Sequence, residues 1–386
     1  MPVNGKLTAI QEKTLLAVLC GIATAAILFA TLWPFNPFPP NRVNWLPNGN
    51  GLNFGGPGIA LSRTDLRADS AIPGDSCSLE LLLRPASNDL STTILSFYTP
   101  RDAQQFAVRQ WTDSLLVTRD VLTAGNKLKR IKLDVDRIFP LGKLTLLTMT
   151  FGPEGTVVYL DGRHEGTFPK FAMTRNDLSG QILLGASPVD NQPWPGEIHG
   201  LAVYAKTLTP AEVARHYANW IDPRAGESTD LDRAITRYAF DEHSGNKIHN
   251  TVPSGPNLEI PSYFQIPHKA MLKVAWKEFE VTKFYAIDLL ENVVGFVPLG
   301  FIFGAYFLLG RNRGRAILYA TLAGGLLSFV VELLQAYIPQ RVSGTTDIIT
   351  NTLGTFLGAM LARPNMVRTI LGKIGWVSEA EEPVTP

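Results

Sequence analysis

The sequence predicts a mixed fold in which a four-helix α-helical transmembrane bundle carries an inserted all-β sandwich. Four apolar stretches hold only four of the 69 charged residues; they are residues 14–34, 286–309, 316–340 and 345–362. The long segment between the first two stretches consists of strand-length apolar runs punctuated by glycine, proline and Asp-Gly turns. Elsewhere the charge density is that of an ordinary soluble domain. A disordered chain and a pure transporter are therefore excluded.

The overall charge excludes one class of partner. With 35 basic and 34 acidic residues, the chain has no basic excess to attract nucleic acid or a strongly anionic surface. The two cysteines, Cys20 and Cys77, lie in different parts of the chain, so they do not form a disulfide framework.

The first apolar stretch, residues 14–34, predicts a transmembrane helix. Lys6 and Lys13 precede about 20 uncharged residues, which is enough to cross a bilayer core of about 30 Å. A cleaved signal peptide is the alternative, because an A-x-A triplet occurs at residues 23–25. We expect a retained helix, since signal cores usually have only about 7–15 residues and this run continues to Trp33.

The distribution of basic residues predicts the orientation. With the N-terminus inside, the cytoplasmic side holds Lys6, Lys13, Arg311, Arg313, Arg315, Arg363, Arg368 and Lys373, whereas the outer side holds Arg42, Lys273, Lys277, Lys283 and Arg341. We therefore expect a bacterial cytoplasmic (inner) membrane protein with both termini cytoplasmic, including a tail at 363–386. Its sandwich, residues 45–275, would be extracytoplasmic.

Several runs within 45–275 are typical of strands. Residues 78–84, 92–99, 105–112 and 143–152 are rich in branched and aromatic side chains. Residues 156–163 contain the pair Asp161-Gly162, which supplies the positive backbone angles of a hairpin turn. Strands at this spacing predict a sandwich.

A short helix is predicted at 209–217, directly after a strand. Thr209 suits the N-cap, Pro210 the first helical position, and Glu212 completes a capping box. This strand and helix, together with the hairpin VVYLDGRHEG at 157–166, resemble the close of a laminin-G-like, concanavalin A-like jelly-roll domain. Residues 238–251 resemble the opening strand of such domains but come last, which implies a permuted strand order or a second partial sandwich.

Polar residues recur at one depth of the predicted membrane helices, within about 10 Å of the outer boundary. They are Asp288 and Asn292, Glu332 and Gln335, Arg341 in a short loop, and Asp347 and Asn351. An ionisable group in hydrocarbon costs at least about 2.5–3.5 kcal/mol, so these side chains should face one another or a water-filled cleft. Arg341 is the predicted counter-ion for Glu332 or Asp347. The alternatives are a ligand-facing site and polar groups that only hold helices together.

Two small-xxx-small pairs predict close helix packing. Gly300 and Gly304 lie on the second apolar stretch, and Gly354 and Gly358 on the fourth. Pro298 is expected to free the carbonyl of Val294 and to kink the second helix locally.

The membrane segments resemble the VanZ-like membrane family. The motifs are Asp288-LLE-Asn292-VVGFVPLG, Glu332-LL-Gln335, Arg341, and Asp347-IIT-Asn351-TLGTFLG, with a first helix that ends in Thr31-LWPF-Asn36. The resemblance covers about 115 residues and implies a four-helix membrane domain, made of the first helix at 14–34 and the three helices of 286–362, with a role of the teicoplanin-resistance type. Members often carry another acid between the arginine and the following aspartate, where Arg341-VSGTT-Asp347 has none. They usually have a short outer loop where this chain inserts a sandwich.

The sandwich offers candidate ligand contacts. Trp111 and Trp194 are predicted to stack on sugar rings, with a core position as the alternative. The histidines show no metal spacing and the sequence has no dense acidic run, so we expect no metal and no cofactor, with calcium in the sandwich left open.

The sequence favours a non-catalytic or accessory cell-envelope protein. Its partners would be the lipid bilayer and an envelope glycan, a lipid-linked saccharide or an envelope protein. The principal alternative is a membrane enzyme in which Glu332 or Asp347 acts as acid or base on a lipid-linked substrate. A third is that the membrane part is only an anchor and the sandwich holds the whole function.

Overall fold

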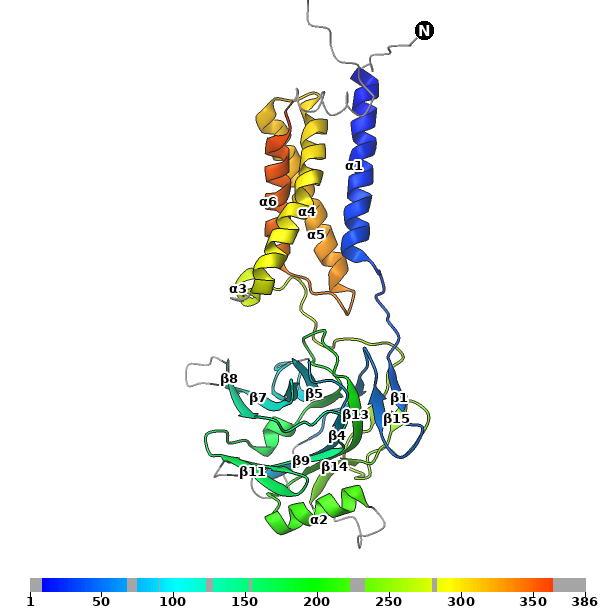
Figure 1. Cartoon of the computed structure of the whole chain (residues 1–386), viewed down its shortest axis with the longest axis vertical. Coiled ribbons are helices and arrows are strands. Elements are labelled where there is room, and N and C mark those ends of the chain that lie inside the picture. The colour runs from blue at the N-terminus through cyan, green and yellow to red at the C-terminus, as the bar shows by residue number, and fades with distance from the viewer. Residues whose placement is uncertain are drawn as a thin grey trace, which may run out of the picture. The chain divides into compact units, whose positions relative to one another are not determined.

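The computed structural model describes residues 9–67, 75–89, 91–122, 128–152, 155–222, 233–279 and 283–363. The predicted tail therefore lies outside the described residues, apart from Arg363. The chain divides into two units (Figure 1). One contains Phe38–Lys269, and the other contains Met1–Pro37 together with Ala270–Pro386.

The first unit is a sandwich of two antiparallel sheets. In the first sheet the order is β1 (Val43–Trp45), β2 (Leu52–Phe54), β13 (Gly196–Tyr204), β4 (Cys77–Pro85), β9 (Thr145–Gly152), β10 (Gly155–Leu160) and β11 (Arg163–Phe168), with β14 (Ala234–Tyr238) also paired to β13. In the second the order is β15 (Lys247–Ile248), β16 (Leu258–Glu259), β3 (Ala60–Ser62), β12 (Gln181–Leu184), β5 (Ser91–Tyr98), β6 (Phe106–Trp111), β7 (Ser114–Leu122) and β8 (Leu128–Val135). A 3₁₀ turn, η1 (Arg175–Leu178), precedes β12.

The core lies between the two sheets. Alternate residues of each strand enter it, such as Leu79, Leu81 and Leu83 of β4, which are fully buried. On β6 the core residues are Phe106 and Val108. The intervening side chains therefore lie on the outer faces of the sheets.

The hairpin and the capped helix form as predicted. Asp161 and Gly162 have φ angles of 48° and 78° and join β10 to β11. Helix α2 (Pro210–Ile221) begins after Thr209, and both hydrogen bonds of the capping box to Glu212 are present. Val213 packs with side chains from the outer face of the first sheet, so α2 covers part of that face.

The late strands complete one sandwich. β14 pairs with β13 in the first sheet, and β15 and β16 extend the second sheet beyond β3. The permuted order is therefore the correct alternative, and a second partial sandwich is not formed by the described residues.

The second unit is helical. Its elements are α1 (Ala9–Leu32), α3 (Ala275–Glu278), α4 (Lys283–Leu308), α5 (Arg313–Ala336) and α6 (Thr345–Leu361). Within the described residues, three helices are long and apolar enough to cross a membrane, over Ile10–Leu32, Tyr285–Leu308 and Arg313–Ala336. The fourth predicted span forms a helix, but its 17 residues reach only about 25 Å, short of a core of about 30 Å. The four-span prediction is thus confirmed for three helices.

Glycines bring α4 and α6 into backbone contact, as the spacing predicts. A Cβ atom on Gly300 would lie 2.1 Å from the carbonyl oxygen of Thr355. On α6, a Cβ on Gly354 would lie 2.2 Å from the Val293 carbonyl oxygen, and one on Gly358 would lie 2.0 Å from that of Val297. Since real Cβ atoms do not approach this closely, only glycine permits the packing.

Candidate functional site

The polar residues of the helical unit gather at one end of it. This is the end at which α1 and α5 finish and α4 and α6 begin (Figure 1). The segment before α3 pairs with the loop between α5 and α6 at this end, where Lys273 forms a parallel β-bridge with Gly344. The Lys273 N–H donates to the Ser343 carbonyl at 2.9 Å, and the Thr345 N–H donates to the Lys273 carbonyl at 2.8 Å.

Asn292 and Asp347 meet between α4 and α6. The Asn292 amide donates to a carboxylate oxygen of Asp347 at 2.8 Å, and both residues are partly buried. Asp288 lies one turn nearer the start of α4 and is exposed. The structure therefore joins two of the predicted site residues directly and leaves Asp288 on the surface of the unit.

Glu332 binds the beginning of α6. Its side chain is 1% exposed, and its Oε2 accepts a hydrogen bond from the backbone N–H of Gly344, the N-cap residue of α6, at 2.7 Å. The hydroxyl of Ser343 donates to the Glu332 carbonyl at 2.8 Å. The first N–H groups of a helix have no intrahelical acceptor and carry partial positive charge, so a carboxylate is stabilising there.

Gln335 and Arg341 bind the end of α1. The Gln335 amide donates to the Thr31 carbonyl at 2.9 Å, and the Arg341 guanidinium donates to the Trp33 carbonyl at 2.8 Å. Carbonyls at a helix C-terminus also lack intrahelical donors, and cations are favourable there. The hydrogen bond found for Arg341 thus differs from the predicted ion pair with Glu332 or Asp347.

Asn351 lies deeper between α5 and α6. It is 3% exposed, and its amide donates to the hydroxyl of Ser328 at 3.0 Å. Its Oδ1 has no hydrogen-bond partner among the described residues. Sequence reasoning missed Ser328, although it lies one helical turn before Glu332 and so shares a face with it.

The two candidate tryptophans have different environments. Trp194 is fully buried between the sheets, and its indole N–H donates to Gln110 Oε1 at 2.7 Å. Its ring is therefore not available to stack on a sugar, which corrects the prediction. Trp111 ends β6 on the outer face of the second sheet and is 56% exposed, so its stacking role stays a prediction.

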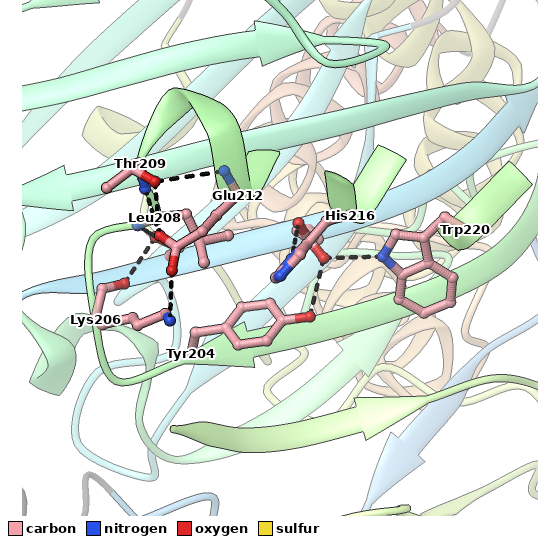
Figure 2. Close-up of polar contacts among 9 residues, drawn as sticks. Tyr204, Lys206, Leu208, Thr209, Glu212, His216 and Trp220 are labelled. Atoms are coloured by element: carbon pink, nitrogen blue, oxygen red, sulfur yellow. Dashed lines mark hydrogen bonds and ion pairs between the residues drawn. The ribbon is translucent and has the colours of Figure 1, made fainter. Parts of the chain in front are cut away.

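A buried glutamate that the sequence analysis missed lies beneath α2. Glu80 is fully buried, and His216 Nδ1 lies 2.9 Å from its Oε1. The Tyr204 hydroxyl and the Trp220 indole N–H donate to Oε2 at 3.1 and 2.8 Å. Figure 2 shows Tyr204, His216 and Trp220 near one another, with their dashed contacts meeting at one carboxylate. The contacts attach α2 to the sheet, and the signal for them is an acid inside the apolar run SLELLL.

The N-terminus of the same helix holds a second polar group. Glu212 accepts from the Thr209 backbone N–H at 2.8 Å and from Lys206 Nζ at 2.9 Å (Figure 2). The Thr209 backbone hydrogen bond and the Lys206 contact lower the pKa of Glu212 to about 2.

Two acids on the strands and turns of the sandwich, Asp161 and Glu197, form ion pairs with protein groups. Asp161 pairs with Lys143 at 2.8 Å, and Glu197 pairs with Arg84 at 2.7 Å and His199 at 2.9 Å. Within the described part of the chain, no group of three or more His, Cys, Asp or Glu residues is arranged to hold a metal ion.

Comparison with known proteins finds a family model that matches part of each unit. The VanZ/LLP1 family model matches residues 234–369, a region that begins at β14 and includes α3 to α6. The model of the concanavalin A-like lectin/glucanases superfamily, of the laminin G type, matches residues 58–214. Among curated proteins, none matches the chain.

Solved structures with some likeness include three domains of botulinum neurotoxins. They are the binding domain of neurotoxin DC in complex with rat synaptotagmin II (13% identity, TM-score 0.34), the type G receptor-binding domain (14%, 0.33) and the serotype D ligand-binding domain in complex with N-acetylneuraminic acid (14%, 0.34). The likeness covers 47%, 46% and 48% of this chain and 46%, 45% and 46% of theirs, so the chain spans about half their length. Scores of this size carry no argument about ligands.

The two family models and the apolar helices show that the chain is a membrane protein that combines a VanZ-like domain with a laminin-G-like, concanavalin A-like domain.

Proposed function

We propose that this protein is a non-catalytic glycan-binding protein of the bacterial cell envelope, held in the cytoplasmic membrane by its VanZ-like unit. The observation that carries the proposal is the concanavalin A-like sandwich, which presents Trp111 on an outer sheet face. The sandwich unit, Phe38–Lys269, is connected at both ends to apolar helices. Domains of this superfamily include lectins, and an exposed tryptophan offers a flat apolar surface on which a sugar ring can stack.

The charges support an extracytoplasmic sandwich. Arg311, Arg313 and Arg315 lie at the turn from α4 to α5 and are all exposed. They are at the opposite end of the helices from the connections to the sandwich, and basic loops favour the cytoplasm. Exposed aromatic residues lie near the connections, as expected at a membrane–water interface; they are Trp33, Trp276 and Tyr337.

The contacts of the carboxylates favour a non-catalytic role. Glu332 is buried and accepts a hydrogen bond from the first turn of α6, which occupies one of its oxygens in holding the helix. An acid or base must reach the proton that it transfers. The alternative, a membrane enzyme that uses Glu332 or Asp347 on a lipid-linked substrate, has less support from this geometry.

The test is glycan binding by the full chain in lipid nanodiscs. A panel of envelope saccharides and peptidoglycan fragments, measured with calcium and with chelator, should give saturable binding. Trp111→Ala should abolish it, whereas Trp276→Ala, which removes another exposed tryptophan, should not. Absence of binding to every saccharide in both conditions would overturn the proposal, and a protein ligand would then become the better hypothesis.

A further inference from the structure

An arginine without a partner among the described residues lies on the outer face of the second sheet. Arg109 is on β6 between the core residues Val108 and Gln110, so its side chain leaves the opposite face of the strand. The residue is partly buried, and its Nε is buried without a hydrogen-bond partner among the described residues.

Other arginines of this sheet have acidic partners. Arg130 on β8 pairs with Asp120 on β7 at 2.9 Å, and Arg119 on β7 pairs with Asp177 at 3.1 Å. In register with Arg109 stand Thr93 on one side and Leu116 on the other. The next residue in that row is the carboxylate Asp134, which is two strands, about 10 Å, from Arg109.

A second unpartnered polar group shares this face. Ser96 on β5 is 1% exposed, and its hydroxyl oxygen has no hydrogen-bond partner among the described residues. It stands opposite Ala107, which is two residues from Arg109 on the same face of β6. Ser96 and Arg109 are thus diagonal neighbours, but Ser96 is buried, so the partly buried Arg109 is the one of the two that a ligand can reach.

Trp111 is the next residue along β6 on the same face as Arg109. It is two residues beyond Arg109 on the same face, at a spacing of about 7 Å along the strand. On the other side, β5 carries Tyr98, whose ring lies 5.4 Å from that of His268. Phe264 packs on Leu61 of β3 and Leu183 of β12, so a later segment of the chain covers the outer face of the sheet at these strands. The same cluster includes Tyr98, so the covered area extends to β5.

Buried polar atoms in folded proteins are nearly always satisfied, and a partly buried cation is unfavourable unless an anion or strong acceptor accompanies it. A guanidinium binds carboxylate and phosphate groups through two parallel hydrogen bonds. An exposed indole beside the guanidinium adds a stacking surface for a sugar ring. This set of groups matches a ring that carries an anionic substituent.

We infer that the outer face of β6 binds an anionic saccharide, with its charged group on Arg109 and its ring on Trp111. The inference rests on the proposed function and specifies the class of glycan. Asp134 is separated from Arg109 by Leu116, so it does not neutralise the cation and leaves it available to the ligand.

The test compares matched saccharides on the full chain in nanodiscs of zwitterionic lipid. The probe is an oligosaccharide of alternating glucuronic acid and N-acetylglucosamine, and its control is the same oligosaccharide after reduction of the carboxyl groups. The acidic form should bind at least about tenfold more tightly, and this preference should decrease as salt is added. A phosphorylated glucose oligosaccharide, compared with its dephosphorylated form, shows whether phosphate is also accepted.

Variants assign the preference to Arg109. Arg109→Gln should remove the preference for the acidic form, whereas Arg101→Gln, which neutralises an exposed arginine in the turn between β5 and β6, should retain it. Thermal unfolding of each variant reports whether the sandwich is intact. Should Arg109→Gln fail to fold, the comparison of acidic and neutral probes on the wild-type chain still decides the inference.

The outcomes separate the two proposals. Equal binding of the anionic and neutral forms would overturn the inference and leave the proposed glycan-binding function standing. A folded Arg109→Gln variant that keeps the preference would also overturn it. Binding to no saccharide at all would overturn the proposed function and the inference together.

Discussion

Each unit of the molecule buries a glutamate almost completely, and the two carboxylates are held by different kinds of donor. Glu80 in the sandwich contacts three side chains, those of His216, Tyr204 and Trp220. Glu332 in the helical unit accepts from the backbone N–H of Gly344. In the sandwich, backbone groups are satisfied by the sheets, so side chains hold the acid. In the helical unit, helix ends need partners because lipid supplies none, and the acid provides one.

The same difference extends to packing. The sandwich core is filled by large side chains such as Phe54, Phe97 and Trp194. The contact between α4 and α6 instead places glycines against backbone, as at Gly300 and Gly358. Between helices in lipid there is no hydrophobic driving force, so close approach of backbones supplies the attraction.

The largest effect is expected in the sandwich, at Glu80. Glu80→Ala leaves the donors of His216, Tyr204 and Trp220 without this acceptor, and should reduce the free energy of unfolding of the sandwich by about 3–5 kcal/mol. Thermal or chemical unfolding of the full chain in nanodiscs measures it. Glu165→Ala removes an exposed glutamate from β11 and should change little. Equal stability of the two variants would show that the buried contacts do not hold α2.

The corresponding change in the helical unit should be smaller. Glu332→Ala removes the acceptor of one backbone N–H and should destabilise the helices by about 1.5–3 kcal/mol. Glu332→Gln keeps an acceptor oxygen and should be tolerated, as should Glu291→Ala at an exposed position on α4. Heat-induced unfolding in detergent compares them. A stable Glu332→Gln variant that loses all cellular function would instead favour the enzyme alternative.

Glycine packing can be tested independently of charge. A Cβ on Gly358 would meet the Val297 carbonyl oxygen at 2.0 Å, so Gly358→Ala should push α4 and α6 apart and destabilise the unit by about 1–3 kcal/mol. Gly295→Ala is the control, because its Cβ would meet nothing within 4 Å. If both variants unfold at the same temperature, the close approach does not stabilise the unit.

The smallest effect concerns pH in the sandwich. The pKa of Glu212 is lowered from 4.5 to about 2, so its carboxylate stabilises the folded state above pH 4.5, and this contribution is lost as the pH falls toward 2. Glu212→Gln should therefore be less stable than wild type by about 1 kcal/mol at pH 6. The two proteins should converge near pH 2. A difference that is constant from pH 6 to pH 2 would contradict the assignment.

The sequence predicted helix starts and hairpin turns well, because both depend on residues that are close together in the chain. The capping box at Thr209 and Glu212 and the turn at Asp161-Gly162 depend on residues at most three apart. The apolar stretches predicted four helices, and the last, Thr345–Leu361, matches its predicted stretch of 345–362 but is too short to cross a bilayer core of about 30 Å.

Contacts between distant residues were predicted less well. The polar residues were expected at one end of the helices, where the structure places them, but the sequence paired Arg341 with a carboxylate and not with the Trp33 carbonyl. Trp194 was taken as a ligand candidate, although Gln110, a residue 84 positions away, binds its indole inside the core. Spacing along the chain carries no information about such partners.

The sequence by itself determined the two types of structural region in this protein, apolar helices and a strand-rich insert. It could do so because hydrophobic periodicity and turn residues act over short distances along the chain. Only the tertiary structure decided which polar groups are satisfied. It gave Glu80, Glu332 and Arg341 partners within the protein and left the Nε of Arg109 without one in the part of the chain that the structure describes. The physical reason is that the need of a buried polar atom for a partner is met by whichever group folding brings within hydrogen-bond distance.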